Sequence, residues 1–440
     1  MRHRVLRHTN AAGKSFANPA RSFGAGAARA LFVAAIMLAA TYAAQAQSGA
    51  TRPRRVPPST VGNDAQPRPT PAPRETPLLD TGPATSPART TPARTAPASG
   101  VSAPQGDTAR AAELYNQNQF AAARDEARRI AAADPNNSSA WRLAGFAGVQ
   151  LKQYAEAAAD LQRAHDLRLA AKEDDPELAD KLAETLVLAE QFDKALPLLV
   201  AATTRAGAKP DAVKFYYRGL AEYRTNKPAE AERSFNEAVR LDPKSAISLF
   251  YLGRISYERG QPDAAVAALN RATAADPKLA QAWTLLTLAY LSRAGAAAGT
   301  PKADADYLNA VRTSDALIRL RADESAMVLN GQALIGAKQY ARAAAVLERA
   351  AAAPTAQGST LYLLGVAHSR AKSFPKAVAA LERAASKSPE DVNVYRELGY
   401  ALEVSKQYAK ALAAYERGAE LAPDDADFKQ SAERVRPFAK

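Results

Sequence analysis

The sequence of 440 residues contains no cysteine. This absence excludes disulfide bonds, thiolate metal sites, cysteine nucleophiles and acylation at an N-terminal lipoprotein cysteine. Histidine is scarce as well: two of the four stand at His3 and His8, and the others, His165 and His368, are far apart. A paired-histidine metal site therefore cannot be built, and we expect no metal and no cofactor.

Large aromatic residues are few, with 12 Phe and 2 Trp in a chain rich in alanine. This composition argues against a large layered core and favours small-residue helices packed at close range. The net charge of +13 is uneven. Residues 1–46 contribute +6 and residues 47–108 contribute +3, which leaves +4 for residues 109–440. The main part of the chain has no broad basic footprint, so nucleic acid is not an expected partner.

Residues 1–46 have the pattern of a targeting segment. Basic residues without any acidic residue precede an apolar run, Ala30 to Ala40, and Ala44-Gln45-Ala46 follows as a small-x-small cleavage site. The apolar run is shorter than the roughly 20 residues that cross a bilayer. We predict a secretory signal peptide that is cleaved after Ala46. An uncleaved signal-anchor and an organellar presequence are the alternatives, and the first would leave the rest of the chain on the same side of the membrane.

Residues 47–108 hold 13 of the 28 prolines among Thr, Ser, Ala and Arg, with almost no large apolar residue. Such a segment cannot form a core, so we predict a disordered, extended linker. It is interpreted either as a spacer or wall-associated basic strand, or as inert disorder.

From Ala109 onward the sequence has helical periodicity with a repeat of 34 residues. Leu252, Gly253, Ala265, Leu269 and Pro277 recur with the same spacing as Leu398, Gly399, Ala411, Tyr415 and Pro423. This pattern is similar to the signature of the tetratricopeptide repeat family. Small residues at the eighth and twentieth positions let two helices approach closely, and Pro ends each unit.

The resemblance implies an all-α fold, a right-handed superhelical solenoid of antiparallel helix pairs. We predict about nine repeats over residues 109–425 and a capping helix over residues 426–440, whose outer face is polar. The sixth repeat is about ten residues too long, and Ala294 to Pro301 are expected to form the inserted loop. The predicted repeats span residues 109–137, 138–171, 176–209, 212–245, 246–279, 280–323, 324–357, 358–391 and 392–425.

Motifs that carry chemistry are nearly absent. Gly295 to Lys302 is rich in glycine but lacks the Gly-Lys-Ser/Thr of a phosphate loop. Asp304 and Asp306 alternate without the Gly and terminal Glu of a calcium loop, and favour a helix start instead. We therefore predict that the protein is not an enzyme.

The family resemblance places the fifth, ninth and twelfth positions of each first helix on a concave groove. Aromatic residues and arginine dominate these positions, which is the composition of interaction hot spots. Packing of some of these rings between repeats is the competing interpretation. The two-carboxylate clamp known in the family is not expected, because its Lys and Asn positions hold other residues. The predicted partner-binding residues are Arg142, Phe146, Tyr216, Tyr223, Phe250, Arg254, Tyr257, Tyr362, Arg396 and Tyr400.

These observations favour a non-catalytic protein-protein interaction scaffold, exported across the inner membrane to the periplasm or envelope, that binds a peptide or protein of the cell envelope. The alternative is an assembly or secretion factor for an envelope polysaccharide, in which the aromatic and arginine groove contacts glycan. In both cases contact with the membrane is expected only through the N-terminal signal.

Overall fold

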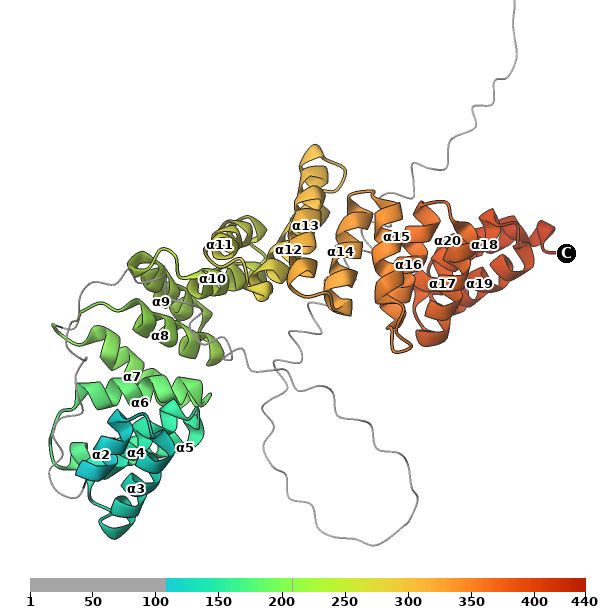
Figure 1. The fold of residues 1–440 in the computed structure, drawn as a ribbon. Coiled ribbons are helices and arrows are strands. Elements are labelled where there is room, and N and C mark those ends of the chain that lie inside the picture. Colours follow the sequence, from blue (N-terminus) through green and yellow to red (C-terminus); the bar gives the residue numbers. More distant parts are fainter. Residues whose placement is uncertain (1–107, 208) are drawn as a thin grey trace, which may run out of the picture. The chain divides into compact units, whose positions relative to one another are not determined.

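The computed structural model describes residues 108–440 except residue 208, so the predicted signal peptide and nearly all of the predicted linker lie outside the described residues. The described part consists of 19 α-helices and one short 3-10 helix, without a strand. Figure 1 shows the helices in chain order. Their bounds are α2 Ala109–Asn116, α3 Phe120–Ala133, α4 Ser138–Gln150, α5 Tyr154–Ala170, α6 Pro176–Leu188, α7 Phe192–Thr204, α8 Ala212–Arg224, α9 Pro228–Leu241, α10 Ala246–Glu258, α11 Pro262–Ala275, α12 Ala280–Ala296, α13 Pro301–Leu320, α14 Glu324–Gly336, α15 Tyr340–Ala350, α16 Gly358–Arg370, α17 Phe374–Lys387, α18 Val392–Val404, α19 Tyr408–Leu421, α20 Ala426–Val435 and η2 Arg436–Phe438.

The described residues belong to two compact units, and the division falls within α10. We call residues 108–255 the N-terminal unit and residues 256–440 the C-terminal unit. In each unit consecutive helices pack against each other, as α4 does on α5 and α16 on α17. Each unit is therefore a stack of antiparallel helix pairs, and we call the first helix of a pair A and the second B. Every predicted repeat range contains one such pair.

The two ends of a helix pair are built from different residue types. Most A helices begin with an Asp or Asn whose side chain accepts a backbone N–H, as Asp175 does from Leu178 at 3.0 Å and Asp323 from Ala326 at 2.9 Å. The turn from A to B instead contains one residue in the left-handed conformation. In the turn after α16, Lys372 has a φ of 61°, and the N–H of Ser373 reaches back to the carbonyl of His368 at 2.8 Å. This arrangement satisfies the last carbonyls of the A helix.

In five repeats the glycine at position eight lies directly against a large side chain of its own B helix. A Cβ on Gly145 would stand 2.5 Å from Leu161 Cγ, and one on Gly331 would stand 2.6 Å from Leu347 Cγ. These distances are far below van der Waals contact, so only glycine fits. The predicted reason for the glycine, close approach of the two helices, is confirmed. The structure adds the facing partner, which is the residue 16 positions later.

The prediction of an inserted loop in the sixth repeat is wrong. Helix α12 continues as far as Ala296, and α13 begins at Pro301, so only four residues connect them. Alanine is the best helix former, and Thr300 caps α13 by accepting the Ala303 N–H, which lets Pro301 occupy the first turn. The extra residues therefore lengthen both helices, and Figure 1 shows their tip extending beyond the neighbouring pairs of the C-terminal unit.

The last α-helix of the C-terminal unit is α20, which packs on α19 and is followed by η2. Phe428, Ala432 and Val435 are its buried residues, and the remaining face is polar or charged. Phe428 fills the space beside Gly418 of α19. Among the described residues no helix combines the length and the apolar character that a membrane crossing requires.

Candidate functional site

The fifth position of the A helix is used for contacts to the next repeat. Arg142 donates to Asp175, the N-cap of α6, at 3.0 Å and to Glu177 at 3.0 Å. Arg396 makes the same kind of ion pair with Asp425, the N-cap of α20. The guanidinium thus binds the carboxylate that caps the following helix. That carboxylate also accepts a backbone N–H, and hydrogen bonds to an ionised acceptor are strong. In this structure Arg142 joins two repeats, and Arg396 joins the last repeat to the capping helix α20.

The aromatic residues at the same position are also packed. Tyr216 lies against Phe235 and Tyr251, with ring centroids 6.2 and 6.3 Å away. Burial, followed by the nearby Tyr251, raises its pKa well above the ordinary value. Tyr362 packs against the core of the last repeats, and burial followed by Glu397 raises its pKa in the same way. Phe250 is 4% exposed.

The prediction that the Phe250 ring is presented to a partner is therefore corrected. The ring is covered within the fold. For Tyr216 and Tyr362 the competing interpretation, packing between repeats, describes their main contacts.

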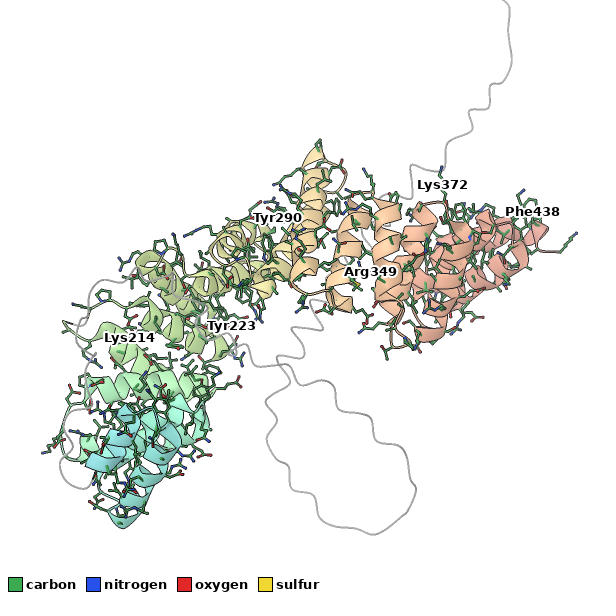
Figure 2. All side chains as sticks on the ribbon, in the orientation of Figure 1. Lys214, Tyr223, Tyr290, Arg349, Lys372 and Phe438 are labelled. Carbon is green, nitrogen blue, oxygen red and sulfur yellow. The ribbon has the colours of Figure 1, made fainter. Side chains whose placement is uncertain are left out.

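The ninth and twelfth positions leave more of their side chains accessible. In the N-terminal unit Phe146, Tyr223 and Arg254 are half-buried. The Arg254 guanidinium lies 5.2 Å from the centroid of the Tyr223 ring, and Arg142 lies 5.1 Å from that of Phe146. Figure 2 labels Tyr223 near the end of α8. Each pair joins an aromatic ring to a cation. Side chains of these types are common in binding surfaces, and part of each one is accessible here.

In the C-terminal unit, Tyr257 and Tyr400 are also half-buried. The Tyr400 ring makes an edge contact with Phe374, whose centroid is 6.4 Å away. These two predicted residues stay accessible in part.

Two tyrosines that the sequence reasoning missed belong to the same aromatic cluster. Tyr251 is buried and stacks on Phe235 with centroids 5.0 Å apart, and Tyr217 lies 5.3 Å from Tyr216. Both occupy the sixth position, next to the fifth. Burial, with Glu184 nearby, raises the pKa of Tyr217 to about 12. The signal that could have found them was the run of neighbouring aromatics at positions five and six in successive repeats.

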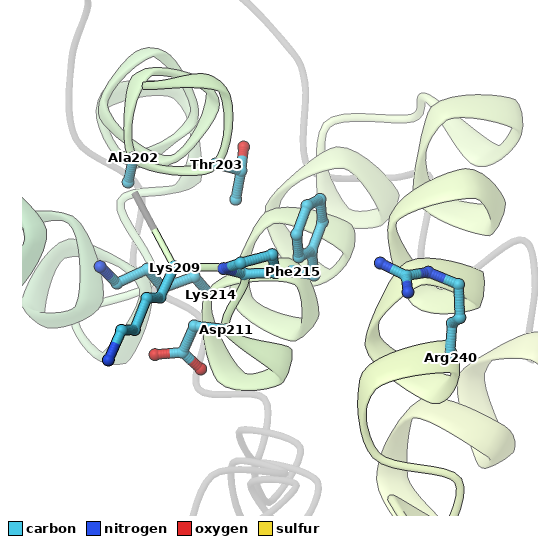
Figure 3. Close-up of a pocket in the computed structure, with 8 residues that line it drawn as sticks. Ala202, Thr203, Lys209, Asp211, Lys214, Phe215 and Arg240 are labelled. Atoms are coloured by element: carbon cyan, nitrogen blue, oxygen red, sulfur yellow. The ribbon is translucent and has the colours of Figure 1, made fainter. Parts of the chain in front are cut away.

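A small cavity lies beside the start of α8 (Figure 3). Its volume of about 100 Å³ is well below the roughly 300 Å³ at which small-molecule sites begin. Two of its charged groups already have partners, since Lys214 pairs with Asp180 and Arg240 with Glu237. The cavity is lined by Ala202, Thr203, Lys209, Pro210, Asp211, Lys214, Phe215 and Arg240.

The buried carboxylates of the described residues connect helices. Asp160 accepts two bonds from Arg128, at 2.9 and 3.0 Å, and Asp306 is held in the same two-pronged way by Arg293. Glu222 is 2% exposed and accepts from Ser234 at 2.6 Å. Such pairs satisfy groups that would be expensive to bury alone. Within the described ranges no three His, Cys, Asp or Glu residues gather in a way that could hold a metal ion.

The stacked helix pairs, with glycine against a large residue in the same place in successive repeats, define an α-solenoid built from repeats. The family model for the tetratricopeptide repeat matches residues 108–176, 216–280 and 362–426. Over these three segments the chain is built from tetratricopeptide repeats, which supports a role as a protein-protein interaction scaffold. No curated protein matches the chain.

Solved structures of tetratricopeptide repeat proteins are similar to parts of the chain. Residues 41 to the end of MamA from Desulfovibrio magneticus RS-1 show 23% identity and a TM-score of 0.36, over 41% of this chain and 96% of that one. A repeat protein of Thermus thermophilus shows 17% identity and a TM-score of 0.31, over 44% and 99%. The C-terminal part of a repeat protein from Cytophaga hutchinsonii shows 15% identity and a TM-score of 0.42, over 66% and 99%.

Proposed function

We propose that this protein is a non-catalytic adaptor of the cell envelope, and that it binds a peptide or protein segment along the A-helix faces of its repeats. The observation that carries the proposal is the pairing of Arg254 with Tyr223 at positions nine and twelve. Both side chains are half-buried, so their positions are held by packing while part of each remains accessible. Held rings and guanidinium groups lose little entropy when a partner binds.

The chemistry of this pair suggests how a partner would bind. The guanidinium offers N–H donors to a carboxylate or to backbone carbonyls of an extended segment, and the tyrosine ring offers apolar area. Phe146 provides a second ring two repeats earlier in the same unit. A peptide with an acidic or carbonyl-rich stretch beside an apolar side chain would match these groups.

The test is affinity capture from an envelope extract with the chain from residue 47 onward. The variant is Tyr223→Ala with Arg254→Ala, which removes the accessible pair and leaves the packed Tyr216 and Phe250 in place. The matched control is Phe192→Ala with Arg224→Ala, because Arg224 lies 5.1 Å from the Phe192 ring and forms a second cation-ring pair in the same unit.

We expect a specific partner to be captured by the parent and the control, and lost by the Tyr223 and Arg254 variant, with equal helicity in all three. Loss in the control alone would move the site to the turn at Phe192. Capture by all three, or by none, would contradict the proposed face, and enrichment of glycan would favour the polysaccharide role instead.

The export part of the proposal rests on the sequence of residues 1–46. We expect the mature protein to be recovered from the periplasmic or envelope fraction with Gln47 as its first residue. Intact-mass measurement of the native protein tests this. Retention of residues 1–46 in a membrane fraction would indicate an uncleaved anchor, and a cytoplasmic protein of full length would contradict export.

A further inference from the structure

Lysine occupies the left-handed turn position in three successive repeats of the C-terminal unit. Lys338, Lys372 and Lys406 have φ values of 59°, 61° and 60°. Glycine adopts this conformation without strain, and Gly260 does so in the corresponding turn of an earlier repeat. A residue with a Cβ is disfavoured there, so the backbone does not explain the lysines.

The charges of the three last repeats are separated between the two ends of their helix pairs. The windows around the A-to-B turns, residues 336–342, 370–376 and 404–410, contain seven Lys or Arg and no Asp or Glu. The windows at the opposite ends, residues 320–326, 386–392 and 420–426, contain seven Asp or Glu and two Lys or Arg, and residues 352–358 there are uncharged. Because successive helix pairs stack with the same orientation, their A-to-B turns lie along one edge of the unit. We call residues 336–342, 370–376 and 404–410 the lysine edge.

The three lysines at the left-handed positions are accessible, whereas the other cations of the lysine edge pair with carboxylates of neighbouring helices, namely Arg342, Arg370, Lys376 and Lys410. Lys338 has an exposed side chain, and its one carboxylate partner, Asp304, is 3.4 Å away and equally exposed. Lys372 and Lys406 are exposed and form no ion pair with any residue that the structure describes. Exposed pairs of this kind contribute little to stability, so the lysines are not needed for the fold.

An exposed aromatic ring stands beside the lysine edge. The side chain of Phe438 is 63% exposed, and its ring lies 5.3 Å from that of Tyr408, two residues after Lys406. Figure 2 shows Lys372 and Phe438 on one side of the C-terminal unit and Arg349 on the other. A row of cations with an exposed apolar ring has the composition of a surface that lies on anionic lipid.

We propose that the lysine edge docks on the surface of a bilayer containing anionic phospholipid. The lysines face the headgroups, and Phe438 enters the headgroup layer. Phe438 distinguishes this occupant from a soluble polyanion, which would use the cations but gain nothing from an exposed ring. The contact is peripheral and independent of the A-helix faces that the proposed function uses.

The absence of cysteine allows a local test on the full chain, in which the basic N-terminal residues are common to every sample. Gln407→Cys on the lysine edge and Gln357→Cys on the opposite edge each carry a polarity-sensitive dye. Vesicles of phosphatidylcholine with equimolar phosphatidylglycerol, and of phosphatidylcholine alone, are the two probes. We expect the dye at position 407 to shift to the blue with the anionic vesicles only, and the dye at position 357 to stay unchanged.

The variant that removes the lysines is Lys338→Gly, Lys372→Gly and Lys406→Gly, which keeps the turn because glycine suits the left-handed conformation. Three lysines near an anionic surface together raise the partition coefficient onto the vesicles by roughly 100-fold. The partition coefficient of the variant should therefore fall by that factor. In a second variant, Phe438→Ser, we expect a smaller blue shift at unchanged salt dependence.

The charge-matched control is Arg349→Ala, Arg383→Ala and Lys387→Ala, three cations of α15 and α17 outside the lysine edge. It should bind vesicles like the parent. An equal loss in the control, a response of both dyes, or no response of either dye would overturn the proposal. A response of the position 407 dye to duplex DNA or polyglutamate without one to vesicles would assign the edge to a soluble polyanion and also overturn it.

Discussion

At the scale of single residues, the fold depends on side chains that match across one helix pair. The glycine at the eighth position has no room for a methyl group in the repeats that carry it, because Leu, Phe or Tyr of the B helix already fills the space. The buried His368 instead contacts the preceding helix pair, since its Nε2 lies 3.2 Å from Glu348 Oε1 of α15 and its side chain is 7% exposed.

Replacing Gly365 with alanine should destabilise the C-terminal unit. The added Cβ would overlap Leu381, and overpacking of this kind costs about 1–3 kcal/mol, against a gain of about 1 kcal/mol from better helix propensity. We expect a net loss of up to about 2 kcal/mol in urea unfolding. Adding Leu381→Val, which shortens the facing side chain, should recover part of this loss, and purely additive losses would contradict the overlap.

His368 should make stability depend on pH. Burial lowers its pKa below the ordinary value of 6.5; Glu348 opposes this effect, and Lys376 adds to it. The unfolded chain therefore takes up the proton first, so the contribution of this residue is complete above about pH 6.5 and is lost as pH falls. We expect the melting temperature to drop between pH 7.5 and pH 5.5, and His368→Gln to flatten that drop. An equal drop in the variant would assign the effect to other groups.

At the scale of elements, the A helices are linked through their N-caps. Asp425 caps α20 by accepting the N–H of Asp427 at 3.1 Å, and Arg396 of α18 binds the same carboxylate. Arg396 also lies 4.5 Å from the centroid of the Phe428 ring. One residue at position five thus fixes where the next A helix begins.

Asp425→Ala should loosen α20. The substitution removes both the cap and the partner of Arg396, and loss of an N-cap costs about 1 kcal/mol. We expect faster amide hydrogen exchange in residues 426–435 and little change in α14. The control is Asp424→Ala. It removes the same negative charge one residue earlier, where the side chain makes no capping hydrogen bond. Unchanged exchange in α20 would show that the cap is dispensable.

At the scale of the whole molecule, stability should be a sum of local terms. Each helix contacts mainly its immediate neighbours, as in other repeat proteins, and the described residues divide into two compact units. A defect in one repeat should therefore spread only through adjacent interfaces.

Phe428→Ala tests this locality. The Phe428 side chain is 1% exposed and packs beside Gly418, and truncation of a buried Phe costs about 3–5 kcal/mol. We expect hydrogen exchange to increase in α19 and α20, to change less in α16 and α17, and to stay at parent values in residues 108–255. A uniform increase across both units would show a single cooperative unit instead.

The sequence by itself determined the helical repeats. Its 34-residue period, the glycine at position eight and the proline at the end of each repeat act within one helix pair, so they can be recognised without knowing the fold. It also placed Tyr223 and Arg254 among the predicted binding residues, and their pairing came from the structure.

Only the tertiary structure decided which of the predicted binding residues face a neighbouring repeat. Arg142 reaches Asp175, 33 residues later, and Tyr216 meets Tyr251 in the following repeat. Such contacts depend on how one pair stacks on the next, which no local pattern contains. The same reason explains the sixth repeat. Its alanines were compatible with a loop or with a longer helix, and packing between α12 and α13 favoured the helix.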